Sequence, residues 1–289
     1  MIDVLLTILL AAAAPEGEAS PVTCAPLQLT AKTTHTWPAA DADQGAAATS
    51  VHFYAVDNSV IAKHDRKSGA LKGRWSDEAE GFIRHLNSCY HDDGKLYCAN
   101  SNYPKLPMGS SVEIFNAETL SHLQSHSFGL MEEGSLTWFD ETDKGWIAGF
   151  THYSAPRGLP YKDNRFSSVV AFDADWRRVG GWLYPDAILD LMAPHGASGG
   201  AIGPDGYLYV TGHDRPEMYV LAAPKMGPYL IHVATIAIEA EGQAFSFIDG
   251  DRRKLVAVNR RGQKRVLEIE IPDVKDGCNR RSLPFRTEP

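Results

Sequence analysis

Histidine and glutamine side chains recur where short, small-residue segments begin. His85, His195, Gln44 and Gln243 each stand at or just before such a segment. Imidazole and amide groups from separate segments could together ring a divalent metal ion, and such a site leaves no local spacing signature. The alternative is that these side chains hydrogen-bond backbone groups where the segments converge. No metal or other cofactor is therefore assigned from the sequence.

A second motif, GASGG at residues 196–200, matches the G-x-S-x-G pattern of serine nucleophiles, and His213 and Asp214 follow it. That pattern has catalytic meaning only at a strand-to-helix turn. Ser198 instead opens a glycine-rich segment, whose small residues favour close packing between strands. We interpret the motif as structural and keep a Ser198 nucleophile as the alternative.

Charged residues offer two further kinds of chemistry. Glu133 and Glu241 each precede a glycine at a segment start. A carboxylate buried there could have a raised pKa and act as a general acid or base, or it could simply pair at the surface. Arg260 and Arg261 lie in the densest basic run of an acidic chain. They could hold a carboxylate or sulfate through paired hydrogen bonds.

Five similar units position these residues. Their inner halves begin at Gln44, His85, Gly134, His195 and Gly242, so the starts are 41, 49, 61 and 47 residues apart. Each unit has a small-residue strand, an apolar strand and a third strand, and all but the last continue into a fourth. This spacing is typical of propeller blades, whose first strands crowd around an axis and favour small residues. The pattern predicts an all-β, five-bladed β-propeller.

The N-terminal segment supplies the missing strand. The sequence APLQLTAKTTHTWPA, residues 25–39, has no partner before the first unit. We expect residues near 26–38 to form the outer strand of the last blade and to close the ring. Cys24 then begins this strand and Cys278 lies in the turn leading to it, which predicts a Cys24–Cys278 disulfide. On the chain-entropy model, such a bond stabilises the fold by about 4–5 kcal/mol.

The hairpin NSCYHDDGKLYCANSN, residues 87–102, carries the other two cysteines. Asp93-Gly94 fits a two-residue type I′ turn, which places Cys89 opposite Cys98. Counting from the turn makes this a non-hydrogen-bonded pair, where side chains approach most closely. A Cys89–Cys98 disulfide is therefore predicted, and disulfides persist in oxidising compartments.

The net charge of the chain and its N-terminal residues indicate which partners it can bind and where it is located. The net charge of −8 and the pI near 5.7 argue against nucleic acid as a bulk partner. Residues 4–14 form an apolar run that is too short to span a bilayer but typical of a signal peptide, although Asp3 stands where a basic residue is usual. We expect residues 1–20 to be a signal peptide and residues 21–289 to be a single propeller domain without a membrane span. The mature protein is then secreted or periplasmic.

Two motifs resemble those of the plant and bacterial type of glutaminyl cyclase, a five-bladed propeller family. DQGAA at residues 43–47 partly matches its T-Q-G-L motif, and VTGHDRPEMYVL at residues 210–221 fits its V-T-G-x-x-x-P pattern. The resemblance covers roughly residues 44–271 and extends to YVTN and strictosidine-synthase-like propellers. It implies a catalytic glutamate in a G-E-G-L-T motif that opens blade two. This chain has HLNSC there, and Asn87 cannot serve as a carboxylate.

Inner-strand starts and the loops between second and third strands meet on one face of a propeller, where loops commonly carry function. The expected ligand site on this face consists of Gln44, His85, Asn87, Asn102, Tyr103, His152, His195, His213, Asp214, Arg215, Gln243 and Arg260. The predicted function is binding of a small molecule, glycan or peptide. The alternative is an enzyme, either a cyclase-like acyl transferase or a metal-assisted lyase acting on an acidic sugar. A structural envelope scaffold, which would expose an apolar patch, is the third possibility.

Overall fold

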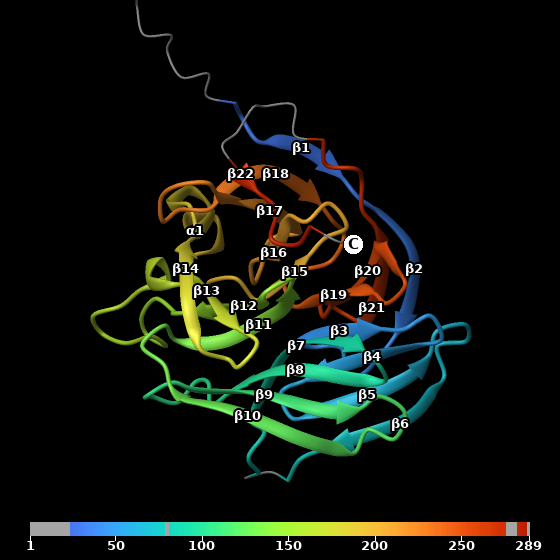
Figure 1. Cartoon of the computed structure of the whole chain (residues 1–289). Helices are drawn as coiled ribbons and strands as arrows, with labels where there is room; N and C mark the ends of the chain where they lie inside the picture. The colour runs from blue at the N-terminus through green and yellow to red at the C-terminus, as the bar shows by residue number, and fades with distance from the viewer. Residues whose placement is uncertain (1–23, 79–80, 276–281, 288–289) are drawn as a thin grey trace, which may run out of the picture.

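Five sheets of mainly antiparallel strands stand around a common axis, as Figure 1 shows. The structure is a computed structural model, and it describes residues 24–78, 81–275 and 282–287. The expected signal peptide and Cys278 lie outside the described residues. Each sheet is one blade, and its first strand lies at the axis. The predicted all-β, five-bladed propeller is therefore confirmed.

The first three blades follow one another along the chain. Blade one consists of β3 (Gly45–Ala48), β4 (His52–Asp57), β5 (Val60–Asp65) and β6 (Leu71–Ser76). Blade two consists of β7 (His85–Asp92), β8 (Lys95–Ser101), β9 (Gly109–Asn116) and β10 (His122–Leu130). Blade three consists of β11 (Ser135–Thr142), β12 (Gly145–Thr151), β13 (Ser168–Asp173) and β14 (Arg178–Leu183).

The last two blades also use strands from the chain termini. Blade four contains β15 (Gly199–Ile202), β16 (Leu208–Thr211), β17 (Glu217–Pro224) and β18 (Ile231–Ala237). The short β22 (Ser282–Leu283) pairs with β17 at Ala223 and Pro224. Blade five contains β19 (Phe245–Ile248), β20 (Asp251–Asn259), β21 (Arg265–Glu270) and β2 (Lys32–Pro38).

The N-terminal strand β2 closes the ring. It pairs antiparallel with β21, from Lys32 opposite Glu270 to Pro38 opposite Arg265. Trp37 of β2 is only 4% exposed and stacks on Phe53 of blade one, with the ring centroids 4.8 Å apart. One strand thus binds blade five through backbone hydrogen bonds and blade one through an aromatic contact. The predicted closure is confirmed.

The preceding strand, β1 (Leu27–Thr30), does not join blade five. It pairs parallel with β18, from Leu27 opposite Ala234 to Thr30 opposite Ala237, and adds an outer strand to blade four. The expectation that residues near 26–38 all lie in blade five is wrong for this part. The physical reason is that β18 would otherwise present an unpaired edge, which the passing chain covers.

Crowding at the axis explains the small residues of the first strands. Every residue of β3, which reads GAAA, is buried. A Cβ on Gly45 would lie 2.8 Å from the Cβ of Ala244 and 2.8 Å from the carbonyl oxygen of Asn87. Blades one, two and five therefore approach so closely here that a methyl group does not fit without a shift of the chain.

The apolar core is divided among the junctions between neighbouring blades. One buried cluster lies at each junction within the described residues, and each cluster draws side chains from both blades. Trp138, which is fully buried, packs at the junction of blades three and four. Trp146 stacks on Trp176 with centroids 4.6 Å apart and joins blade three to the aromatic residues of blade two. Each blade is thus stabilised mainly by its neighbours.

A short insertion lengthens the connection between blades three and four. The helix α1 (Asp186–Met192) follows Pro185 and buries Ile188, Leu189 and Met192 against the blade junction. A single turn of 3₁₀ helix, η1 (Asn164–Phe166), lies in the long loop of blade three. The Asn164 side chain donates to the Leu189 carbonyl oxygen over 2.7 Å and so ties this loop to α1. The insertion accounts for the long interval between the third and fourth units.

The β7–β8 hairpin has the predicted register. Asp93 and Gly94 have φ values of 42° and 72°, as a type I′ turn requires. Cys89 lies opposite Cys98 at a Cα–Cα distance of 4.1 Å, and the two are joined by the predicted disulfide. Both residues are buried at the junction of blades one and two. Within the described part of the chain, no helix is long and apolar enough to cross a membrane.

The closing strand generates a stability prediction. Trp37→Ala should lower the free energy of unfolding by about 3–5 kcal/mol, because it leaves a cavity at the junction of blades five and one. Thr36→Ala is the matched control: Thr36 is exposed on the same strand and should change stability by no more than about 0.5 kcal/mol. Urea unfolding followed by tryptophan fluorescence and circular dichroism measures both. Equal losses in the two variants would contradict the closing role of Trp37.

The second disulfide remains a prediction. Mass spectrometry of unreduced peptide digests should reveal a peptide pair linked through Cys24 and Cys278, together with the Cys89–Cys98 hairpin. A Cys24–Cys89 link would contradict the predicted pairing.

Candidate functional site

A polar pocket opens at the mouth of the axis where the inner strands begin. Its volume is about 450 Å³, and all five blades contribute to its wall. The lining residues are Gln44, Asn58, Arg84, His85, Asn87, Tyr103, Pro104, Tyr153, Arg157, His195, Ser198, His213, Gln243 and Arg260. We call this the axial pocket. It is large enough for a ligand of the size of a sugar or an amino acid.

Most residues of the predicted site meet in the axial pocket. Gln44, His85, Asn87, Tyr103, His195, His213, Gln243 and Arg260 all line it. Their convergence follows from the repeat, because equivalent positions of successive blades face the same end of the axis. Asp214 lies at the rim and contacts both His195 and His213.

Three residues of the predicted site lie elsewhere. The side chain of Asn102 bonds the backbone of Pro107 and Gly109 and so holds its own loop together. His152 is buried, with its Nε2 2.9 Å from the carbonyl oxygen of Glu132. Arg215 lies 3.9 Å from Glu217 on the next strand. Their positions in the repeat were similar to those of the lining residues, but their side chains turn toward neighbouring loops.

Sequence reasoning did not place Arg84, Arg157 or Pro104 at this mouth of the propeller. Arg84 immediately precedes the predicted strand start at His85, and Arg157 lies in the long loop of blade three. In the sequence, Arg84 and Arg157 are recognisable only as basic residues next to a strand or loop that is expected at this end of the axis. Asn58, Pro104, Tyr153 and Ser198 line the pocket as well.

Aromatic rings form one side of the pocket. The ring of Tyr103 lies 5.0 Å from that of His85 and 4.5 Å from that of Tyr153, measured between centroids. Tyr153 continues the series to His195, 6.3 Å away. Arg157 Nη1 donates to the Tyr103 hydroxyl over 3.4 Å and joins the long loops of blades two and three. Burial raises the pKa of Tyr153, so its phenol is neutral at physiological pH.

The side chains that carry a permanent charge in the axial pocket are all positive. Arg84, Arg157 and Arg260 line it, and no aspartate or glutamate is among its described lining residues. Arg260 Nε lies 3.1 Å from Glu241 behind the wall, while its Nη2 lies 3.3 Å from His213 Nε2 and 3.5 Å from His213 Nδ1. Nearly equal distances to both ring nitrogens place the guanidinium over the imidazole face. The site therefore presents positive charge in a protein of net charge −8.

The two glutamates considered as substitute acid/base groups are both engaged in ion pairs. Glu133 binds Arg178 on β14. Glu241 binds Arg260 and also Arg261, at 3.1 and 3.0 Å. Neither lines the axial pocket. Ser198 does line it, but the strand β15 follows it directly, without the helix that a nucleophile elbow requires.

His85 is the most deeply buried histidine of the axial pocket. Its Nδ1 lies 2.5 Å from Asn58 Oδ1, an arrangement in which Nδ1–H donates to the amide oxygen. Burial lowers the pKa of His85 to about 4, opposed by attraction to Asp43 and assisted by repulsion from His213. The ring is therefore neutral at pH 7, and its Nε2 is an acceptor.

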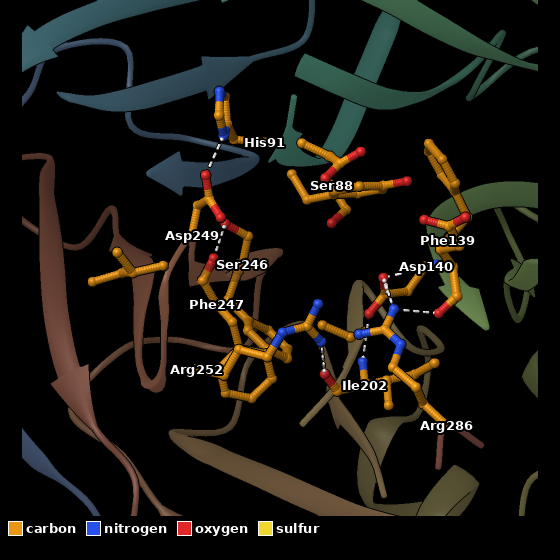
Figure 2. A pocket seen from close by; sticks show the side chains of 17 residues that line it. Ser88, His91, Phe139, Asp140, Ile202, Ser246, Phe247, Asp249, Arg252 and Arg286 are labelled. Carbon is orange, nitrogen blue, oxygen red and sulfur yellow. Dashed lines mark hydrogen bonds and ion pairs between the residues drawn. The ribbon is translucent and has the colours of Figure 1, made fainter. Parts of the chain in front are cut away.

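A second, smaller pocket lies at the opposite end of the inner strands. Figure 2 shows the side chains that line it. Its volume is about 80 Å³, enough for only a few water molecules. Asp140 accepts from the Ile202 amide over 2.7 Å and lies 3.3 Å from Arg286. Arg252 points into this pocket and donates to the Ile202 carbonyl oxygen over 3.3 Å. Because charges here are internally paired, we take the axial pocket as the candidate site.

The buried state of His85 gives a pH prediction. Its pKa is lowered in the folded state, so the unfolded chain takes up the proton first as the pH falls through 6.5, and stability is lost down to about pH 4. The contribution of this group is on the order of 3 kcal/mol. His85→Gln lacks it, so the difference in unfolding free energy between variant and wild type should change between pH 7 and pH 4.5. Parallel pH profiles in urea unfolding would contradict the prediction.

Comparison with known proteins assigns no family. No family model matches the chain, and no curated protein matches it. Among solved structures, the WD40 repeats of RRP9 give a TM-score of 0.45 at 10% identity, with 79% of each chain covered. A chain of the mitotic checkpoint complex gives 0.44 at 8% identity, covering 93% of this chain and 100% of that chain. These similarities carry no argument about function, and the chain is classified from its own topology as a five-bladed β-propeller.

Proposed function

We propose that the protein is an exported propeller that binds a small, polar, anionic ligand in the axial pocket. The observation that carries the proposal is the charge of that pocket, to which three arginines and no described carboxylate contribute. Arginines that line a concavity create a positive potential there and attract anions, even where one of them, Arg260, also pairs with a carboxylate behind the wall. An arginine fork can bind a carboxylate through two charge-assisted hydrogen bonds.

Neutral polar groups favour a ligand that also carries hydroxyl groups. The amides of Gln44, Asn58, Asn87 and Gln243 line the same pocket. Asn87 Oδ1 is buried without a hydrogen-bond partner, which is costly unless a ligand or water supplies a donor. The Tyr103 ring is partly exposed and can contact the apolar face of a sugar ring. An acidic monosaccharide combines these three requirements.

Export is supported by the disulfide in blade two. Cys89 and Cys98 are buried and bonded, and such bonds are rare in reducing compartments. The apolar N-terminal run is consistent with the same interpretation. The proposed location is therefore the periplasm or the cell exterior.

Binding ranks above catalysis because the pocket lacks the expected acid/base group. Asn87 stands where the cyclase resemblance implies a glutamate, and Glu133 and Glu241 are paired outside the pocket. A cyclase-like proton transfer would have to use another side chain. The binding proposal needs only the groups that line the pocket.

The test compares a charged probe with a neutral one. Calorimetric titration should show that D-galacturonate binds at least tenfold more tightly than D-galactose, a difference of about 1.4 kcal/mol. Arg260→Gln should weaken galacturonate binding at least tenfold and leave galactose binding nearly unchanged. Arg265→Gln removes the same charge from an exposed position on β21, outside the pocket, and should have little effect.

Two results would contradict the proposal. Equal affinity for the two sugars would remove the role of the anion. Equal effects of Arg260→Gln and Arg265→Gln would show that net charge matters and the axial pocket does not.

A further inference from the structure

Two histidines and an aspartate gather at the rim of the axial pocket within blade four. His195, His213 and Asp214 offer ligand atoms that all lie within 4.8 Å of one another. In the described part of the chain, no other three histidine, cysteine, aspartate or glutamate side chains meet in this way. His213 Nδ1 lies 2.8 Å from Asp214 Oδ1, and His195 Nδ1 lies 3.4 Å from Asp214 Oδ2. The two imidazoles therefore turn the same nitrogen toward one carboxylate.

The pairing of two strands holds the trio together. Ser198 N donates to the carbonyl oxygen of Thr211 over 2.9 Å where β15 and β16 pair, so the residues just outside this pair remain adjacent. His195 precedes β15, and His213 and Asp214 follow β16. The two imidazole rings stack with their centroids 3.8 Å apart and an interplanar angle of 24°. The donors are thus arranged by the blade, and a bound ion is not required to assemble them.

From this geometry we propose that His195, His213 and Asp214 bind a divalent transition metal of the zinc type. Zinc prefers imidazole nitrogen and carboxylate oxygen at bond lengths of about 2.0–2.2 Å, which places tetrahedral donors about 3.4 Å apart. The separation of 3.4 Å between His195 Nδ1 and Asp214 Oδ2 matches that edge length, whereas the 2.8 Å between His213 Nδ1 and Asp214 Oδ1 is a hydrogen-bond distance. Metal binding would require the two stacked rings to rotate, so that both nitrogen lone pairs, which lie in the ring planes, point at the ion.

The Nδ1 atom of His195 is poorly satisfied. It is buried, and its contact with Asp214 Oδ2 at 3.4 Å is longer than a good hydrogen bond. A metal–nitrogen bond would replace this weak contact with a stronger one. Asp214, by contrast, is about half exposed, with a side-chain exposure of 53%, so an ion can enter from solvent.

The proposed metal would keep an open coordination position toward the axial pocket. Three protein ligands and one free position are typical of zinc sites that bind or activate a ligand. His195 and His213 line the pocket, so the free position would face its interior. An anionic ligand held by the arginines could then coordinate the metal. Metal binding is nevertheless expected without that ligand, so this inference does not depend on the proposed function.

The test is metal binding by the untagged full chain. Calorimetric titration with Zn²⁺ at pH 7.5 should give one site per chain with a Kd of about 1 µM or tighter. Co²⁺ should occupy the same site, produce visible d–d absorption and be displaced by Zn²⁺. His195→Gln, His213→Gln and Asp214→Asn should each weaken Zn²⁺ binding at least tenfold. Thermal unfolding with EDTA present verifies that each variant is folded.

His126→Gln is the matched control, because it removes a half-buried imidazole on β10, outside both the trio and the axial pocket. Its Zn²⁺ affinity should equal that of the wild type. The proposal is overturned by a lack of stoichiometric Zn²⁺ binding, or by binding that none of the three substitutions weakens. A loss in His126→Gln as large as in His213→Gln also overturns it, because the effect would then not be specific to the trio. Galacturonate titrations in EDTA separate this outcome from failure of the anion-binding proposal.

Discussion

The close approach of five inner strands at the axis is the constraint on which the rest of the structure depends. Where Gly45 meets Ala244 and the Asn87 backbone, no room exists for a further methyl group. Large side chains at this level would force the blades apart and open the apolar junctions between them. Along the axis, the pockets lined by the described residues therefore lie at its two ends. The residues at strand starts and strand ends thus acquire their positions in the pockets from packing, before any chemistry is considered.

The axial pocket also depends on closure of the ring. Its wall uses residues from every blade, so the spacing between Gln44 in blade one and Gln243 or Arg260 in blade five is fixed across the closing junction. Ala244 N donates to the Gln44 carbonyl oxygen over 3.0 Å directly beneath the pocket, and Trp37 fills the same junction farther from the axis. A gap at that junction would separate Arg260 from the amide groups opposite it. The strand that stabilises the fold is for this reason also a determinant of the site.

The sequence predicted features that follow from backbone periodicity. Blade spacing, the closing strand and the register of Cys89 and Cys98 depend on strand alternation and turn type, which local residues specify. Three features depended on tertiary packing that no local pattern encodes. Residues 27–30 cover the edge of blade four, Arg252 turns into the smaller pocket, and His152 turns away from the axial pocket. Long side chains reach several ångströms from their Cα atoms, so a correct position in the repeat does not determine which cavity they enter.

The two ends of the axis differ in where the carboxylates that pair with their arginines lie, and this difference underlies the proposal of the axial pocket as the binding site. At the smaller pocket, Arg286 is paired with Asp140, and Arg252 donates to a carbonyl oxygen. At the axial pocket, Arg260 is paired with Glu241, which lies behind the wall and does not line the pocket. Asn87 Oδ1 is buried there without a hydrogen bond, and His195 Nδ1 has a long contact of 3.4 Å with Asp214 Oδ2. Each unsatisfied buried group costs about 1–3 kcal/mol. A folded chain of modest stability retains such costs where a bound molecule removes them, which is the reason to propose the axial mouth as the site of both the ligand and the metal.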